Sequence, residues 1–106
     1  MYDLKWSESE KKLSRRIFEA ALQAELADII AKFKAKAAAV TTPDEMWAVR
    51  DFLAQAQHEI ERKYDYRYSQ LILVFATLVR EGRITEAQLH GLSEEKLSYI
   101  RHIVSL

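Results

Sequence analysis

The chain has 106 residues, which fits one domain, and its 16 Lys and Arg balance its 16 Asp and Glu to a formal net charge of +0. The missing basic excess argues against a general nucleic-acid binder, and the 49% content of hydrophobic residues excludes intrinsic disorder. The absence of cysteine excludes disulfides, thiolate metal sites and cysteine nucleophiles.

Turn-forming residues are scarce, because the chain contains only 2 Gly and 1 Pro. An all-β fold needs more tight turns than these residues provide, so the composition predicts an all-α fold in a single domain over residues 1–106. No apolar run approaches the ~18 residues of a membrane span, and no signal-peptide core follows the charged start. We therefore expect a cytoplasmic protein without membrane insertion.

The first predicted element is a long, extended helix over residues 6–40. Ser7 and Glu10 have the spacing of a capping box, and no residue between Ser7 and about Ala39 breaks a helix. Apolar residues recur every three or four positions and form one stripe along this helix. They are Phe18, Leu22, Leu26, Ile29, Ile30, Phe33, Ala37 and Val40.

The length of this helix predicts a homodimer. About 33 residues at about 1.5 Å each extend roughly 50 Å, whereas the remaining ~65 residues form a helical globule only about 25–30 Å across. The projecting half would expose an apolar stripe that a second copy can cover about a two-fold axis. The predicted dimer interface comprises Leu22, Leu26, Ile30, Phe33 and Val40. The alternative is a kink between Ala20 and Asp28 that folds the helix back, although neither Pro nor Gly is present there to cause it.

A second helix is predicted over residues 43–62, with Thr42 as N-cap, Pro43 at the first helical position and Glu45 completing a capping box. One face is apolar and comprises Met46, Val49, Leu53, Ala56 and Ile60. The opposite face comprises Trp47, Arg50, Asp51, Ala54, Gln57, His58 and Glu61. Tryptophan beside Arg and Asp is typical of a binding hot spot. A solvated polar face, with Trp47 packed against the first helix, is an equally good interpretation of the composition.

Residues 65–106 are predicted to form a small helical head. Residues 66–81 begin with alternating tyrosines, which favours a strand, but the apolar run that follows continues to Gly82, a suitable left-handed helix cap. No other segment offers a partner strand, so we predict a buried helix over 66–81.

Two shorter helices complete the predicted head. Thr85 and Gln88 begin the first, which Gly91 ends, and Ser93 begins the last helix. Its inward-facing residues are Leu97, Ile100 and Val104. This pair resembles a helix-turn-helix in outline, but two glutamates directly after Ser93 would repel DNA phosphates. An ordinary helical hairpin is therefore favoured.

The sequence contains few residue patterns that are typical of catalytic, metal-binding or phosphate-binding sites. His58, His90 and His102 lie on separate predicted helices, and Gly82 and Gly91 are too far apart to form a phosphate-binding loop. Small helical chains with one core seldom build a deep polar pocket. We expect no enzyme activity, no cofactor and no metal site.

Several segments together resemble the fluorescence recovery protein family. The resemblance covers about Pro43 to Val104, with a compatible long helix before it. The segments are Trp47-Ala48-Val49-Arg50-Asp51-Phe52-Leu53, His58-Glu59-Ile60, Lys63-Tyr64-Asp65-Tyr66-Arg67-Tyr68-Ser69, Leu71-Ile72-Leu73-Val74-Phe75-Ala76, Leu78-Val79, Glu81-Gly82, Gly91-Leu92 and Glu95-Lys96-Leu97. The string from Lys63 to Ser69 is unusual enough to be specific.

The resemblance implies an all-helical dimer without a cofactor. Members of the family bind photoactivated orange carotenoid protein, chiefly through its C-terminal domain, and accelerate its return from the red to the orange form. This ends photoprotective quenching at the cyanobacterial phycobilisome. The alternative is a dimeric adaptor of the same type with a different native partner, any effect on the carotenoid protein being incidental.

The resemblance also favours a partner-binding role for the polar face of the second helix. The family's binding patch includes a Trp and an Asp that match Trp47 and Asp51. Gln57 replaces a family Arg, and Arg50 stands where members often have His. The expected partner-binding residues are Trp47, Arg50, Asp51 and Gln57. A second family contact, made by a Phe and a Lys on the head, corresponds here to Leu73 and Tyr99, so the chain is a divergent relative.

Overall fold

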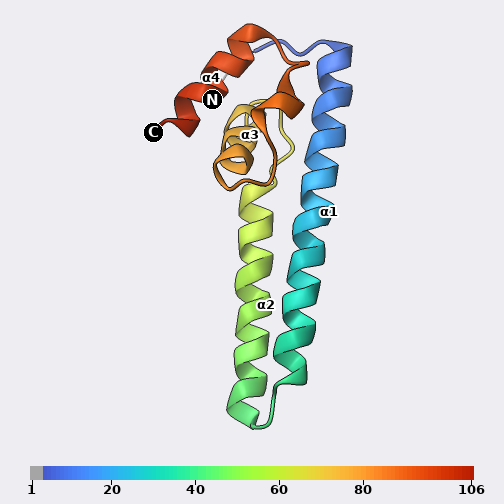
Figure 1. The fold of residues 1–106 in the computed structure, drawn as a ribbon, viewed down its shortest axis with the longest axis vertical. Coiled ribbons are helices and arrows are strands. Elements are labelled where there is room, and N and C mark those ends of the chain that lie inside the picture. Colours follow the sequence, from blue (N-terminus) through green and yellow to red (C-terminus); the bar gives the residue numbers. More distant parts are fainter. Residues whose placement is uncertain (1–3) are drawn as a thin grey trace.

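The longest element, α1 (Glu8–Ala38), runs without interruption for 31 residues. The computed structural model describes residues 4–106, so residues 1–3, which the single-domain prediction includes, lie outside the described residues. The predicted capping box is confirmed, because the Glu10 N–H donates to Ser7 Oγ at 3.2 Å and the Ser7 N–H donates to Glu10 Oε1 at 2.9 Å. The alternative of a helix that folds back in its middle is wrong (Figure 1).

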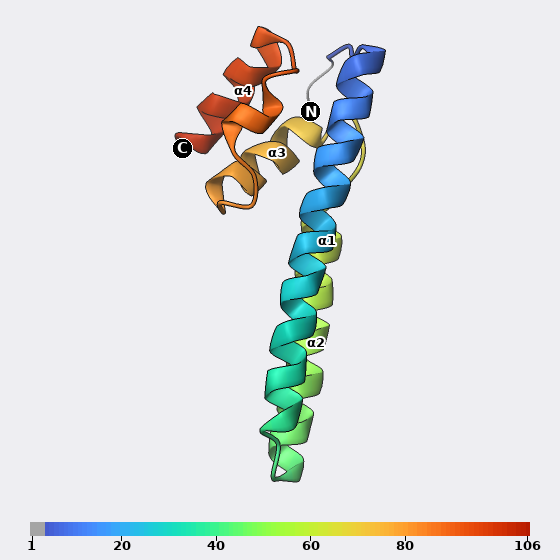
Figure 2. The same cartoon turned by 45° about the vertical axis from the view of Figure 1, so that its right-hand side comes forward.

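α2 (Pro43–Lys63) begins at the predicted cap, where Thr42 Oγ1 accepts from the Glu45 N–H at 3.2 Å. The predicted capping box is incomplete, because the Glu45 carboxylate accepts from the Thr41 N–H at 3.2 Å instead of the Thr42 N–H. α2 runs back alongside α1 in a hairpin that extends well beyond the rest of the molecule (Figure 1, Figure 2). We call the part of this hairpin from residue 22 to residue 63 the arm.

The arm corrects the expectation that α1 projects alone from a globule formed by the rest of the chain. α2 accompanies the projecting half of α1, and the molecule measures 53 × 22 × 22 Å. Two helices side by side bury each other only in part. α1 accordingly has no buried residue beyond Ala21, and α2 has none at all.

The segment between α2 and α3 (Leu71–Arg80) corrects the predicted helix over residues 66–81, because residues 66–70 are not helical. The alternating tyrosines lie on this irregular segment and pack against α1. Tyr64 and Tyr66 meet the Phe18 ring edge-on, with ring centroids 5.4 and 4.9 Å away. The alternation of tyrosines therefore indicates non-helical backbone. The apolar run that follows is helical, and the prediction extended this helix too far toward the N-terminus.

The rest of the head follows the prediction closely. η1 (Glu86–Leu89) begins at the Thr85 cap, and α4 (Glu94–Val104) begins at the Ser93 cap. Gly82 has a φ of 75° and ends α3 in the left-handed conformation that favours glycine.

The core lies in the head, where α3 packs against α4 and the first half of α1 closes one side. Its largest fully buried apolar side chains are Phe75, Leu71, Ile72, Leu78, Leu89 and Ile100. α1 contributes Ile17, Phe18 and Ala21. Gly91 lets α1 approach closely, because a Cβ atom there would lie 2.7 Å from Leu13 Cδ2. The head is therefore a well-packed body that holds the base of the arm.

Candidate partner-binding surface

The arm carries a concentration of large apolar side chains that the protomer leaves exposed. Their exposed fractions are 53% for Ile30, 36% for Phe33, 46% for Met46, 49% for Trp47 and 37% for Leu53. Met46 and Leu53 belong to the face of α2 that was predicted to point inward. The structure corrects this prediction, because both side chains are exposed in the protomer. Contiguous apolar surface of this kind marks an interaction site in soluble proteins.

Two apolar grooves lie between the helices of the arm. The first, about 280 Å³, is lined by Leu26, Ile29, Leu53, Ala56, Gln57 and Ile60. The second, about 340 Å³, is lined by Phe33, Ala37, Val40, Met46 and Val49. Four of the five residues expected at the dimer interface thus lie on the arm surface. The exception is Leu22, which is half-buried and packs against the core of the head.

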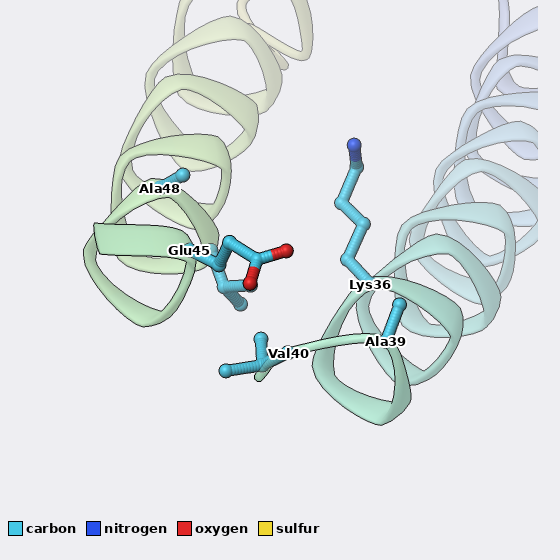
Figure 3. A pocket seen from close by; sticks show the side chains of 6 residues that line it. Lys36, Ala39, Val40, Glu45 and Ala48 are labelled. Atoms are coloured by element: carbon cyan, nitrogen blue, oxygen red, sulfur yellow. The ribbon is translucent and has the colours of Figure 1, made fainter. Parts of the chain in front are cut away.

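A third, smaller hollow of about 220 Å³ lies at the tip of the arm. In Figure 3, Lys36 of α1 and Ala39, the residue after this helix, face Glu45 and Ala48 of α2 across Val40. The hydroxyls of Thr41 and Thr42 donate to Glu45 Oε1 at 2.8 and 3.0 Å and hold the pKa of that carboxyl below its ordinary value. Glu45 thus holds the turn between the helices, whereas the Lys36 ammonium lies 5.0 Å from the centroid of the Phe52 ring.

Three of the four expected partner-binding residues contact one another on the outer face of α2. The Arg50 guanidinium lies 5.4 Å from the centroid of the Trp47 ring and donates to Asp51 Oδ1 through Nε at 3.3 Å and Nη2 at 3.2 Å. Trp47 is half exposed, so the interpretation in which it packs away against α1 is not supported. The exposed Arg50–Asp51 pair adds little stability, and both groups remain available to a partner.

Gln57 stands apart from these three residues. It lies two helical turns beyond Arg50, about 10 Å along the axis, and lines the first apolar groove. A neutral amide at the edge of an apolar groove leaves that part of the arm without a cation. The sequence pattern placed Gln57 on the face of Trp47 but did not show its position beside Leu26 and Ile29 of α1.

A buried ion-pair network, which the sequence analysis missed, lies where the arm joins the head. Lys63 Nζ is 2.7 Å from Glu25 Oε2 and 2.7 Å from Glu81 Oε1. The Tyr64 hydroxyl donates to Glu25 Oε1 at 2.7 Å, and Arg83 Nη1 pairs with Asp28 Oδ2 at 2.6 Å. The partners are 18 to 55 residues apart in the chain, so no local pattern connects them.

The network shifts the pKa values of its members. Burial alone would raise the pKa of Glu25, but hydrogen bonds from Lys63 and Tyr64 outweigh burial and hold it below its ordinary value. Burial would lower the pKa of Lys63, and its two carboxylate partners instead raise it. Burial and the bond to Glu25 both raise the pKa of Tyr64. All three shifts favour a charged, hydrogen-bonded network near neutral pH.

A second buried pair lies inside the head. Lys96 Nζ is 3.2 Å from Glu10 and donates to the Lys5 carbonyl at 2.6 Å, and Glu10 also accepts from the Ser93 N–H at 2.8 Å. Burial would raise the pKa of Glu10, but the hydrogen bonds from Ser7, Ser93 and Lys96 lower it. This pair fastens the start of the chain to α4.

The described residues offer little for catalysis. Within residues 4–106, no group of three or more His, Cys, Asp or Glu side chains is placed to hold a metal ion, and no helix is long and apolar enough to cross a membrane. His58, His90 and His102 are all exposed and lie on different elements. The interaction surface of the arm is therefore the best candidate for the functional site.

The comparisons with known proteins agree with the resemblance in the sequence. The family described as photoprotection regulator fluorescence recovery protein matches residues 6–104. The fluorescence recovery protein of Synechocystis sp. is 38% identical over 101 residues, which cover 95% of this chain and 93% of that protein. A solved Synechocystis structure aligns with a TM-score of 0.91 at 37% identity, covering 96% of this chain and all of that one. The Fremyella diplosiphon structure aligns at 0.92 and 32%, with the same coverage.

Proposed function

This chain belongs to the fluorescence recovery protein family, and we propose that it is a non-enzymatic, dimeric regulator that binds photoactivated orange carotenoid protein and accelerates its return to the orange form. The observation that carries the proposal is the exposed cluster of Trp47, Arg50 and Asp51 on a helix with no buried residue. Trp and Arg are enriched among the residues that dominate binding energy at interfaces.

The homodimer rests on the exposed apolar side chains of the arm. Phe33 of α1 and Met46 of α2 line one groove, Leu53 lines the other, and Ile30 is 53% exposed, on a two-helix arm that is too thin to enclose them. A second arm packed about a two-fold axis covers both grooves with the same residues of the other copy, as a self-complementary interface requires.

Such a protein accelerates recovery by binding energy alone. A binding protein shifts an equilibrium only by the difference in its affinity for the two states. It likewise raises a rate only when it binds the transition state more tightly than the starting state. We propose that the arm and the head together bind the closing arrangement of the carotenoid protein's two domains more tightly than the open one. The regulator is then released unchanged, and no cofactor takes part.

The direct test is binding to the isolated C-terminal domain of orange carotenoid protein, measured by size-exclusion chromatography with light scattering and by titration calorimetry. We expect a complex, and we expect Trp47→Ala to weaken it by roughly thirtyfold, which corresponds to ~2 kcal/mol for an aromatic anchor. Gln55→Ala, an exposed change on the same helix but outside the polar face that carries Trp47, is the matched control. Equal affinities for the wild type and Trp47→Ala would place the binding surface elsewhere.

One observation supports a second candidate function. Gln57 puts a neutral side chain at the edge of the first groove where the family resemblance implies Arg, and this favours, as the second candidate, a dimeric adaptor with a different native partner. No binding to either form of the carotenoid protein, together with a stable dimer, would favour this candidate.

A further inference from the structure

α1 runs unbroken through the head and the arm, whereas α2 is attached to the head by few apolar contacts. Buried residues of α1 end at Ala21, and α2 contributes none to the core. At the end of α2, Tyr64 packs edge-on against Phe18, and the following irregular segment leads to α3. Apolar packing therefore holds α1 to the head, whereas the end of α2 is held by the contact between Tyr64 and Phe18 together with polar interactions.

Lys63, the last residue of α2, supplies one such interaction. Its ammonium bridges Glu25 on α1 and Glu81 at the end of α3, each at 2.7 Å, and its side chain is only 9% exposed. One side chain thus joins the two helices of the arm to the first helix of the head. Tyr64 and Arg83 add bonds to the same Glu25 carboxylate, at 2.7 and 3.5 Å.

The ion pairs of Lys63 contribute more to the relative placement of the helices than to the free energy of unfolding. Desolvation offsets most of the attraction in a buried ion pair, so such a pair adds little net stability. Its bonds are nevertheless directional, and removing the cation would leave the Glu25 carboxylate, whose side chain is 13% exposed, without its ammonium partner and close to Glu81. A movement of the end of α2 away from α1 and α3 therefore costs free energy, because it breaks the bonds of Lys63.

Lys63 also lies between the two surfaces that the proposed function uses. It lines a cleft of about 200 Å³ together with Leu73, Val74 and Thr77 of α3. Leu73, which is 37% exposed, occupies the expected contact position on the head. The cluster of Trp47, Arg50 and Asp51 lies on the same helix as Lys63, toward the tip of the arm.

We propose that Lys63 is a positioning residue that fixes the angle between arm and head, so that the cluster on α2 and the surface around Leu73 can engage one partner molecule at the same time. This inference rests on the proposed function, because it concerns how the same regulator presents two contact surfaces. Two weak contacts act together only when the geometry allows simultaneous engagement, and the gain in affinity is lost when it does not.

The angle can be measured without any partner. The chain has no cysteine, so Gln55→Cys on α2 of the arm and Ser98→Cys on the head, both exposed, accept spin labels selectively. Dilution with unlabelled protein leaves the distances within one protomer. Lys63→Met should broaden or shift this distance distribution. Arg62→Met, which removes an exposed cation paired only with Glu59, should leave it unchanged. An unchanged distribution in Lys63→Met would overturn the proposal.

The functional consequence is measured as the concentration of protein that gives half-maximal acceleration of carotenoid-protein recovery. Lys63→Met should raise this concentration by about tenfold or more, because only one of two contacts then acts at a time. Lys96→Met, which breaks the separate buried pair in the head, controls for a loss of stability without a change in the arm. An equal effect of the two substitutions would also overturn the proposal.

The outcomes separate this inference from the proposed function. A wild type that fails to accelerate recovery contradicts the function, whereas a wild type that accelerates and a Lys63→Met variant that matches it contradict only the positioning role. Should Lys63→Met fail to fold, Glu81→Gln removes one of the two bridged carboxylates at a side chain that is 42% exposed. The same broadening of the distance distribution is then expected, and its absence counts against the proposal.

Discussion

At the scale of single residues, the candidate site consists of one contact cluster and one isolated position. Arg50 lies over Trp47 and also binds Asp51, so the guanidinium restrains both groups before a partner arrives. Restraint of this kind lowers the ordering cost of binding. Gln57 does not belong to this cluster and lines an apolar groove instead. The two positions should therefore respond differently to substitution.

Gln57→Arg should strengthen binding to the carotenoid protein if the partner presents a carboxylate near the first groove, as the family resemblance implies. The gain should be larger at low salt, because exposed charges are screened over about 10 Å at ~0.1 M ionic strength. Affinity measured at low and high salt checks this, with Gln57→Met as a control that changes size and polarity without adding charge. Identical affinities for Gln57→Arg and the wild type at low salt would contradict it.

The buried carboxylates predict a loss of stability in acid. Glu10 and Glu25 have folded-state pKa values below the ordinary 4.5, so each stabilises the fold above that pH. Their contribution is lost as the pH falls through the lowered values, because the unfolded chain then binds more protons. Thermal unfolding between about pH 3 and 7 should show the loss below about pH 4.5.

Glu25→Gln should make this acid loss smaller, since it removes one of the two poorly exposed carboxylates, Glu10 and Glu25, whose pKa values are lowered. Glu19→Gln, an exposed change on the same helix, is the control and should follow the wild type. Equal slopes of stability against pH in the wild type and Glu25→Gln would contradict the role given to the network.

At the scale of elements, local signals predicted the ends of helices better than their places in space. The caps at Ser7, Thr42, Thr85 and Ser93 are all observed, because each depends on a side chain bonding within three residues. Residues 66–70 were assigned to a helix wrongly, since their tyrosines pack on Phe18, a contact that no local pattern shows. The position of α2 beside α1, and the bridge at Lys63, depend on the same kind of distant contact.

α3 is the central element of the head, and its register is directly testable. Phe75 is fully buried and Leu73, two residues earlier, is 37% exposed. Phe75→Ala should destabilise the fold by about 3–5 kcal/mol, through lost burial and the cavity left behind. Leu73→Ala should cost far less. Chemical denaturation followed by circular dichroism measures both, and equal costs would mean that the register of α3 is wrong.

At the scale of the whole molecule, the narrow arm exposes apolar grooves, and the proposed homodimer covers them with a second copy. Ile30→Glu should disrupt this dimer, because a charge buried at the interface without a partner costs several kcal/mol, on the order of 3–5. The protomer should still fold, since Ile30 is 53% exposed in it. Light scattering at tens of micromolar, with Gln23→Glu as an exposed control on the same helix, checks this. A monomeric wild type would contradict the dimer.

The proposed acceleration of the recovery of orange carotenoid protein can be measured as the dark recovery rate of the photoactivated protein. The red form is produced by blue light, the light is switched off, and the return of the orange absorbance is followed with increasing amounts of this chain. We expect a recovery rate that rises with the concentration of the wild type and saturates, and a markedly smaller rise with Trp47→Ala. A recovery rate that stays at its unassisted value at every concentration of the wild type would contradict it.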